Sequence, residues 1–325
     1  MRSVRFHELG PASVLRLEEV DAPTPGSGDL LVRVEAAGLN FSDIGKRIGQ
    51  YLEPTPLPFT PGSEVCGEVV AVGPEVRRFR VGDRVAGVSP WRSGGYAEFA
   101  ILPERVAAAV PVDVAAENAV AVSNQGATAF HLLTTMARMA KGESALVSAA
   151  GGGCGGLILQ LARRSGAGTL IGLASTEAKR AAALEDGADF VFDPADPEWP
   201  RQAAERVPGG VDVFLDSVGG ELYESGLGLL GPFGRAVTYG LASGRPTPVI
   251  PLMLMRRCAS VAGFHLDLVM DRPGLMSQTL SDLYDRVAQG ALKPRIAARF
   301  ALKDAVAAHE FMESRAAIGK IIIRP

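Results

Sequence analysis

A cluster of glycines between residues 151 and 156 is the part of the sequence that points most directly to chemistry. An apolar run, 145–150, precedes the cluster, and a helical pattern, 157–164, follows it. Glycines let the backbone approach a phosphate closely, and the N–H groups at the start of a helix attract anions. A strand, a glycine turn and a helix are the context of a dinucleotide-binding turn. The stretch therefore predicts a pyrophosphate site.

The glycines fit the dinucleotide fingerprint G-x-G-x-x-G in two registers. These are Gly151, Gly153 and Gly156, which match it literally, and Ala150, Gly152 and Gly155, which match it if alanine is accepted in first place. Spacing alone does not decide between the two registers. In either of them the backbone of residues 152–155, including that of Cys154, is predicted to face the phosphates.

The second apolar run, 169–174, indicates which dinucleotide binds. NAD sites usually carry an acid about 20 residues after the glycines, where it binds the ribose 2′-OH. This chain has Ser175 at that place, and Lys179 follows one turn later. A hydroxyl, helix N-terminal amides and a cation suit a 2′-phosphate, so we predict NADP(H). Glu177 lies where an acid serves the dipole of the next helix.

Composition limits the class of protein. The 325 residues exceed what one compact core usually takes, so we expect two domains. The net charge of -3 gives no basic field for nucleic acid. The three cysteines are too far apart for a disulfide framework or a cysteine-rich zinc lobe, which fits a reducing cytoplasm. No signal peptide or apolar membrane span is visible. We therefore expect a cytoplasmic protein that binds no membrane.

The elements that must position the glycine turn follow from periodicity. Residues 1–122 are predicted to begin a small β-barrel, with alternating apolar residues at 31–36, 64–73 and 95–100. Four prolines make 51–62 a stiff loop without helix. The stretch 114–140 is predicted to be helical.

A break in this helical stretch is predicted near residues 123–126. Residues 123–264 then alternate between strand and helix patterns, which predicts an α/β domain with a doubly wound parallel sheet. Ligands of such sheets lie beyond the carboxyl ends of the strands. The residues that this rule places along the cofactor are Ser175, Ser217, Gly240 and Leu241. The tail, 265–325, ends in an apolar strand that we expect to pack back onto the barrel.

Several short motifs occur in the order and spacing of one known family. They are 38–43 (GLNFSD), 61–69 (PGSEVCGEV), 81–85 (VGDRV), the turn at 149–155, 216–219 (DSVG), and 314–315 (SR) with 319–320 (GK). With them the chain resembles the zinc-independent quinone oxidoreductases (NADPH:quinone reductases) of the medium-chain dehydrogenase/reductase superfamily, over nearly its whole length. The resemblance implies a GroES-like β-barrel domain and a Rossmann domain inserted before the tail. It also implies a homodimer built on the last Rossmann strand, here 260–264.

The resemblance also implies roles for individual residues. Asn40 and Thr128 match residues near the nicotinamide, and Tyr51 matches a tyrosine of the substrate cleft. Phe264 and Lys320 join the expected cofactor-binding residues. Tyr51 and Asn40 are the catalytic candidates, because a tyrosine O–H could donate a hydrogen bond or a proton to a developing enolate.

Catalytic zinc is not expected. The zinc alcohol dehydrogenases of the superfamily have a cysteine where Asn40 stands and a histidine where Ser63 stands, and neither residue of this chain is a plausible zinc ligand. The activity that the resemblance implies is therefore NADPH-dependent hydride transfer to a small molecule, a quinone or a conjugated carbonyl, without a metal. Many quinone reductases carry a second tyrosine where this chain has Gly45, which puts the quinone in question more than the fold.

Two alternatives stay open. The position of Tyr51 also resembles that of the catalytic tyrosine in 2-enoyl thioester reductases. Such an enzyme needs a basic groove for a CoA or phosphopantetheine arm, for which the candidates are Arg92, Arg256 and Arg257. The other alternative is a non-enzymatic NADPH-binding structural or RNA-binding protein, against which the acidic balance of the chain weighs.

Overall fold

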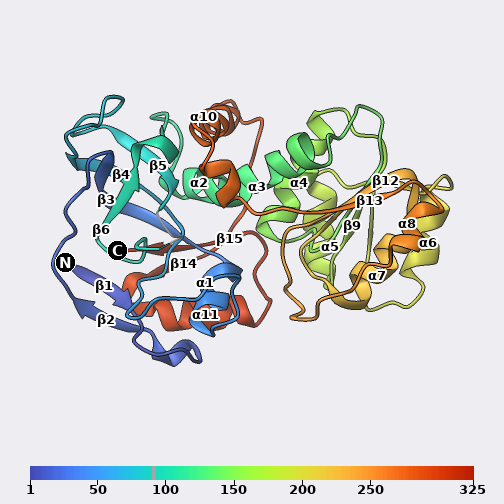
Figure 1. Ribbon diagram of the computed structural model, residues 1–325, viewed down its shortest axis with the longest axis horizontal. Coiled ribbons are helices and arrows are strands. Elements are labelled where there is room, and N and C mark those ends of the chain that lie inside the picture. The colour runs from blue at the N-terminus through green and yellow to red at the C-terminus, as the bar shows by residue number, and fades with distance from the viewer. Residues whose placement is uncertain (90–92) are drawn as a thin grey trace. The chain divides into compact units, whose positions relative to one another are not determined.

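The computed structural model describes residues 1–89 and 93–325. Its contacts divide the chain into two compact units. The first unit contains residues 1–127 and 267–325, and the second contains residues 128–266 (Figure 1). The first unit thus joins both ends of the chain, and the second is inserted between them.

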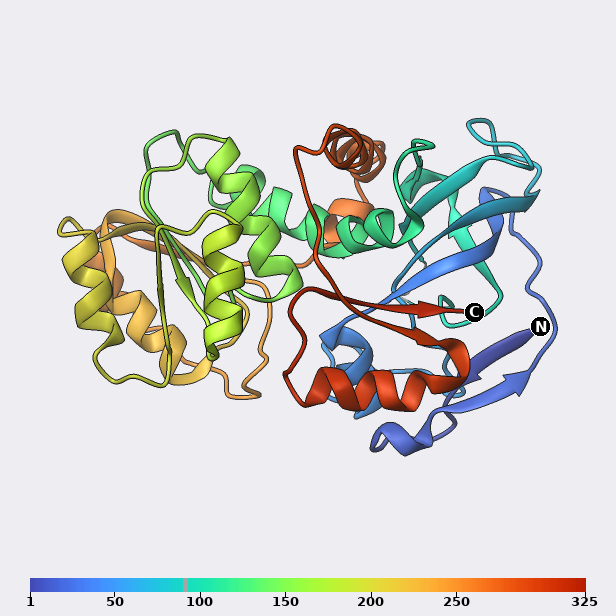
Figure 2. The same ribbon diagram turned by 180° about the vertical axis from the view of Figure 1, so that it is seen from behind.

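The first unit is built on a sheet with the strand order β14-β15-β3-β4-β5-β7, in which β6 also pairs with β3. The strands are β3 (Asp29–Leu39), β4 (Glu64–Val72), β5 (Arg84–Val88), β6 (Phe99–Pro103), β7 (Ala107–Ala109), β14 (Ile296–Ala301) and β15 (Lys320–Arg324). β15 pairs antiparallel with β3, so the apolar tail returns to the barrel as expected (Figure 2). Its side chains Ile321 and Ile323 belong to the buried core.

The remaining elements of this unit cover the sheet or connect its strands. They are β1 (Arg2–Arg5), β2 (Arg16–Glu19), α1 (Phe41–Arg47), α2 (Ala116–Ala121), α9 (Asp267–Met270), α10 (Leu275–Ala288) and α11 (Ala305–Glu313), with 3-10 turns at Ala12–Val14, Glu104–Val106 and Leu302–Asp304. The proline-rich loop 51–62 contains no helix, as predicted. β6 begins later than the predicted strand at 95–100. The backbone at Gly95 and Tyr96 donates instead to the loop carbonyls of Gly62 and Pro61.

The helical stretch after α2 differs from the prediction. The expected break at 123–126 is a π-helical turn, Val122–Gly126, which leads directly into α3 (Ala127–His131) and a second π-helical turn, Leu132–Met136. The Ser123 hydroxyl donates to the carbonyl of Ala119, four residues earlier, and so holds the widened turn. The α-helix is thus interrupted where the sequence predicts a break, but by a π-helical turn and not by a loop.

The second unit contains a six-stranded sheet in the order β10-β9-β8-β11-β12-β13, and all its pairs are parallel. The strands are β8 (Ala145–Val147), β9 (Leu170–Leu173), β10 (Phe190–Phe192), β11 (Val211–Asp216), β12 (Leu230–Thr238) and β13 (Ser260–Gly263). The helices are α4 (Gly153–Arg164), α5 (Glu177–Glu185), α6 (Trp199–Arg206), α7 (Gly220–Gly228) and α8 (Pro251–Met255). In chain order the strands are arranged 3-2-1-4-5-6, which is the Rossmann order. The predicted fold class is therefore confirmed.

None of the helices within the described residues is both long and apolar enough to cross a membrane.

Candidate active site

In the glycine turn of the second unit, no side chain caps the first N–H groups of the helix that follows. α4 begins at Gly153, and its N-cap residue, Gly152, provides no side-chain cap for the first N–H groups of the helix. A Cβ on Gly155 would press on the carbonyl oxygen of Ala149 and lie 2.8 Å from the Cα of Ala150. The third fingerprint glycine is the one that lets the helix pack closely on its strand. This geometry therefore favours the register of Ala150, Gly152 and Gly155.

The other predicted cofactor residues of this unit lie at one edge of the parallel sheet. Ser175 follows β9, Ser217 follows β11, Gly240 and Leu241 follow β12, and Phe264 follows β13. Because the strands are parallel, their carboxyl ends meet at the same edge as the glycine turn. Thr128 lies in α3, at the start of the unit and away from this set of loops in the sequence.

Hydrogen bonds tie these loops together. The N–H of Ser217 donates to Ser148 Oγ at 2.9 Å, and the N–H of Ala242 donates to the carbonyl of Ser217. The buried Asp216 carboxylate accepts the N–H groups of Val218 at 3.1 Å and Gly219 at 2.8 Å, so this acid orders its turn. Burial raises the pKa of Asp216 above its ordinary value.

The start of α5 lies against the glycine turn. Thr176 caps the helix by accepting the N–H of Lys179 at 3.3 Å, while Ser175 is exposed. A Cβ on Gly151 would meet Cβ and the backbone of Lys179. Arg180 pairs with Asp193 at 3.0 Å, so its guanidinium is engaged at the end of β10. Lys179 lies on the same helix turn, four residues after Ser175.

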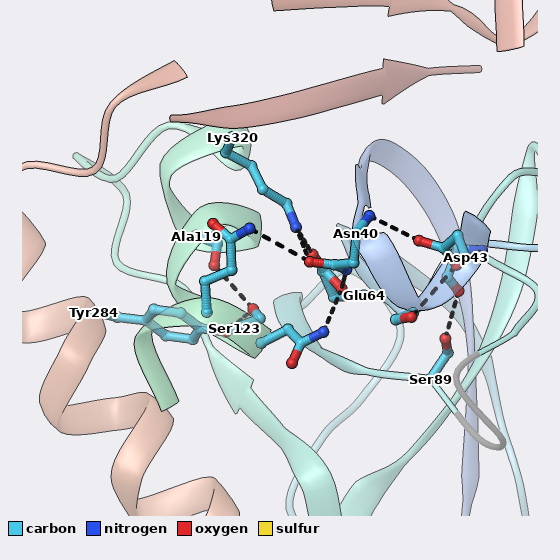
Figure 3. Close-up of polar contacts among 12 residues, drawn as sticks. Asn40, Asp43, Glu64, Ser89, Ala119, Ser123, Tyr284 and Lys320 are labelled. Carbon is cyan, nitrogen blue, oxygen red and sulfur yellow. Dashed lines mark hydrogen bonds and ion pairs between the residues drawn. The ribbon is translucent and has the colours of Figure 1, made fainter. Parts of the chain in front are cut away.

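A buried polar cluster in the first unit surrounds Asn40, which is 7% exposed (Figure 3). Asn40 Nδ2 donates to Glu64 Oε2 at 2.7 Å, and Asn40 Oδ1 accepts from Lys320 Nζ at 2.7 Å. Lys320 Nζ also forms an ion pair with Glu64 Oε1. Three segments thus meet at one carboxamide: the start of α1, the start of β4 and the start of β15.

The ion pair between Glu64 and Lys320 is enclosed by protein, with 0% and 1% of the two side chains exposed. Removing one member of such a pair typically costs about 3–5 kcal/mol, because the other charge stays buried. Replacing both by apolar residues is often neutral, so a buried pair adds little net stability by itself. Its clearest effect here is on Asn40, which both side chains hold.

The π-helical turn adds two amides to the cluster. Asn124 Nδ2 donates to Glu64 Oε2 at 3.4 Å, and Gln125 Nε2 donates to Asn40 Oδ1 at 3.5 Å. Ser123, the preceding residue, contacts Tyr284 OH at 2.9 Å and anchors the turn to α10. π-helical turns occur mostly as single insertions, often at functional sites. This one brings consecutive polar residues to one cluster.

Asp43 caps α1 beneath the cluster. Its carboxylate accepts the N–H of Asn40 at 2.8 Å and the N–H of Gly62 at 3.1 Å, and the Ser63 hydroxyl lies 3.5 Å away. Burial, with the negative charge of Glu64 as the next cause, raises the pKa of Asp43 to about 6. This acid therefore holds the backbone that carries Asn40, and its charge changes near neutral pH.

Two family models match the chain. Residues 26–112 match the alcohol dehydrogenase GroES-like domain, and residues 186–323 match the zinc-binding dehydrogenase model. A quinone oxidoreductase of Pseudomonas aeruginosa is 33% identical over 100% of this chain and 99% of its own length. The synaptic vesicle membrane protein VAT-1 homolog of rat is 34% identical over 93% of this chain and 78% of its own length. The structure of Escherichia coli quinone oxidoreductase complexed with NADPH has 31% identity and a TM-score of 0.94, with both chains covered completely.

The chain belongs to the quinone oxidoreductase family. The family lies in the medium-chain dehydrogenase/reductase superfamily, so the resemblance drawn from the sequence motifs is confirmed.

The zinc-binding description of one family model raises the question of whether this chain holds a metal. Catalytic zinc takes His, Cys and carboxylate ligands. Within residues 1–89 and 93–325, no group of three or more such side chains is placed to hold an ion. The two carboxylates beside Asn40 and Ser63 are already engaged, Glu64 by an ammonium and an amide and Asp43 by backbone N–H groups. The donor set around Asn40 does not fit zinc.

Tyr51 lies in the loop after α1, half-buried, and Lys46 Nζ lies 5.1 Å from the centre of its ring. A Cβ on Gly45 would lie 3.5 Å from Tyr51 Cδ2, so a larger residue at position 45 would contact this ring. The ring of Tyr51 thus lies between the ammonium of Lys46 and the backbone at Gly45.

The sequence analysis missed most of the Asn40 cluster. Glu64 appeared only within a family motif, while Asn124 and Gln125 lay in the stretch taken for a helix break. A signal was available for Glu64, because a charged residue at the start of the buried run Val65–Cys66 must find a partner. Nothing in the sequence identified that partner as Lys320, which lies 256 residues later.

Proposed function

We propose that this quinone oxidoreductase family member is an NADPH-dependent oxidoreductase that transfers hydride to a quinone or a related conjugated carbonyl. The observation that carries the proposal is the uncapped glycine turn at the start of α4, which leaves backbone N–H groups for a pyrophosphate. The proposal is supported by a full-length likeness to Escherichia coli quinone oxidoreductase, whose structure is a complex with NADPH.

NADPH would be held mainly by the second unit. Gly153, Cys154 and Gly155 would bind the pyrophosphate through the backbone N–H groups of the first turn of α4. Gly152, whose own N–H donates to the carbonyl of Ala149 at 2.9 Å, would let the phosphates approach the backbone closely, and Ser175 and Lys179 would bind the 2′-phosphate. Further predicted contacts come from Thr128, Ser217, Gly240, Leu241 and Phe264. When bound, NADPH supplies the hydride, and the protein supplies position and electrostatics.

The first unit would supply the polar groups that act on the acceptor. Asn40 and Tyr51 are the proposed catalytic residues. An amide N–H or a phenol O–H can stabilise the negative charge that develops on an acceptor oxygen during hydride transfer. The ammonium of Lys320 is 1% exposed and bonded to Asn40 and Glu64, which favours an indirect role over a direct contact with the cofactor.

The enoyl thioester alternative finds less support. Arg257 donates to the carbonyls of Gly228 and Leu230, next to the amino end of β12 and away from the carboxyl edge of the sheet. Arg256 is exposed, and Arg92 lies outside the described residues. The homodimer stays a prediction, for which β13 offers the edge strand of the six-stranded sheet.

The test is oxidation of NADPH by the EDTA-treated protein, with an ortho-quinone and crotonyl-CoA tested side by side. We expect turnover of the quinone and little turnover of the thioester. Turnover of the thioester alone would move the assignment to enoyl reduction. Salt-dependent retention of RNA without any turnover would favour the non-enzymatic alternative.

Tyr51→Phe separates the same two functions within one site. If Tyr51 only lines the cleft for a quinone, the variant keeps kcat within about threefold. If Tyr51 is the proton donor to an enolate, kcat for the thioester falls by about a hundredfold or more. The two acceptors are compared in steady-state assays of the same preparation.

A further inference from the structure

The Asn40 carboxamide has only one orientation compatible with its neighbours. A lysine ammonium can only donate a hydrogen bond, and an ionised carboxylate can only accept one. Lys320 Nζ must therefore face Asn40 Oδ1, and Glu64 must face Asn40 Nδ2, as Figure 3 shows. A flipped amide would place donor against donor and acceptor against acceptor.

The same contacts determine what Asn40 has left to offer a ligand. A carboxamide has two N–H donors and two acceptor lone pairs. The oxygen of Asn40 accepts from Lys320 at 2.7 Å and from Gln125 at 3.5 Å, which uses both lone pairs. Nδ2 gives one N–H to Glu64. The capacity that remains after these three contacts is one N–H donor.

A flexible asparagine could equally present its oxygen to a ligand. Here the two charges that prevent this come from β4 and β15, and both are enclosed by protein. The buried ion pair of Glu64 and Lys320 therefore contacts both Oδ1 and Nδ2 of Asn40, whose side chain is 7% exposed. Burying two charges costs desolvation energy.

We propose that Glu64 and Lys320 are positioning residues that hold Asn40 as a hydrogen-bond donor, and that its remaining N–H binds the carbonyl oxygen of the hydride acceptor. This rests on the proposed function. Hydride leaves NADPH with its electron pair and forms a C–H bond with the acceptor, so NADPH becomes NADP⁺. The acceptor oxygen takes the negative charge, which the Asn40 N–H stabilises until a proton from water neutralises it.

The kinetic test is a double-mutant comparison. Asn40→Ala should lower kcat for the quinone by about a hundredfold, the usual effect of losing one such donor. Glu64→Gln combined with Lys320→Met removes both charges together, so that neither is left buried alone, and should lower kcat about tenfold. Adding this pair of substitutions to Asn40→Ala should lower kcat no further, because the pair acts through Asn40. The dissociation constant of NADPH should stay unchanged throughout.

The matched control uses the ion pair between Arg33 of β3 and Glu68 of β4, which lies in the same sheet at 2.6 Å but is solvent-exposed. Arg33→Met with Glu68→Gln makes a similar chemical change and should leave kcat unaltered. If Glu64→Gln with Lys320→Met lowered kcat by the same factor in the wild type and in Asn40→Ala, the positioning role would be overturned. Weaker NADPH binding at unchanged kcat would overturn the assignment to the acceptor oxygen.

Hydrogen exchange of the Asn40 side-chain amide tests the orientation of Asn40 without requiring turnover, so it separates this inference from the proposed function. The chain has three asparagines, Asn40, Asn118 and Asn124, so ¹⁵N-asparagine labelling gives a simple spectrum of side-chain amides. We expect slow hydrogen exchange at the Asn40 amide and fast exchange after Glu64→Gln with Lys320→Met. Unchanged exchange would show that the pair does not orient Asn40. A wild type without quinone turnover would overturn the proposed function and the acceptor contact, while this exchange would still decide the orientation.

Discussion

The two polar regions of the molecule are built by opposite means. The glycine turn of the second unit exposes backbone N–H groups and works because side-chain atoms are missing at Gly152 and Gly155. The Asn40 cluster of the first unit consists of side chains, four of which are charged or bonded to a charge, and nearly all of which are buried. The first kind of site is damaged by adding atoms, and the second by removing them.

The difference also concerns specificity. A helix N-terminus attracts any anion that can approach it, so the turn recognises a phosphate group in general. The Asn40 cluster has a single arrangement of donors and acceptors, because an ammonium and a carboxylate leave its amide no alternative. The molecule thus combines a tolerant backbone site with an exacting side-chain site.

The largest effect is expected from adding one methyl group to the turn. Gly155→Ala places a Cβ against the backbone of Ala149 and Ala150, which cannot move as the tip of a side chain can. We expect a loss of about 3 kcal/mol in the free energy of unfolding and at least a hundredfold weaker NADPH binding. Chemical denaturation and a fluorescence titration with NADPH measure the two effects.

The control for this variant is Gly228→Ala, in which the added methyl group at the end of α7 meets no atom within 4 Å. Its stability should be equal to that of the wild type or slightly higher, because alanine restricts the unfolded chain. Equal losses in both variants would mean that glycine at position 155 has no special packing role.

A smaller effect is expected from Asp43, whose ionisation changes the free energy of unfolding with pH. The folded protein raises the pKa of Asp43 to about 6 from an ordinary value of 3.8. The folded state therefore keeps this proton where the unfolded chain has lost it. Asp43 should consequently stabilise the fold at low pH, and this contribution is lost as pH rises through 6. Between pH 4.5 and pH 7 the loss amounts to about 2 kcal/mol.

Asp43→Asn should remove this contribution to the pH dependence. The variant also loses one hydrogen bond, because an asparagine amide has one oxygen and Asp43 accepts the N–H groups of Asn40 and Gly62 with two. Unfolding by urea at several pH values gives both curves. The difference in stability between wild type and variant should shrink steadily as pH increases from 4.5 to 7. Parallel curves would show that Asp43 does not titrate in this range.

The contrast between the two sites also explains what could be predicted from the sequence. The glycine turn and its two strands lie within 45 consecutive residues, 144–188, so periodicity and one motif were sufficient to place them. The Asn40 cluster joins positions 40, 64, 124, 125 and 320. Taken singly, these residues are typical of a helix cap, a strand end and a polar helix. The pairing of β3 with β4 and β15 brings positions 40, 64 and 320 together, and the π-helical turn adds positions 124 and 125.

The π-helical turn shows what a local prediction leaves out. Low helix propensity at Ser123–Gly126 indicates a break, and propensity alone does not include the contact of Ser123 with Tyr284 of α10. The register of the glycine motif was likewise undecided until the packing of Gly155 on Ala149 and Ala150 was known.

The smallest effect is expected from the one charged side chain that we assign to the backbone-built site. Lys179→Ala leaves the turn and the cap of α5 in place, since Thr176 accepts the backbone N–H of residue 179. The variant should bind NADPH about tenfold more weakly, or about 1.4 kcal/mol, and NADH with unchanged affinity. Lys303→Ala, in the first unit, controls for a general loss of positive charge. Equal weakening toward both cofactors would assign Lys179 to the structure of the turn, and the 2′-phosphate would then be recognised by backbone and Ser175.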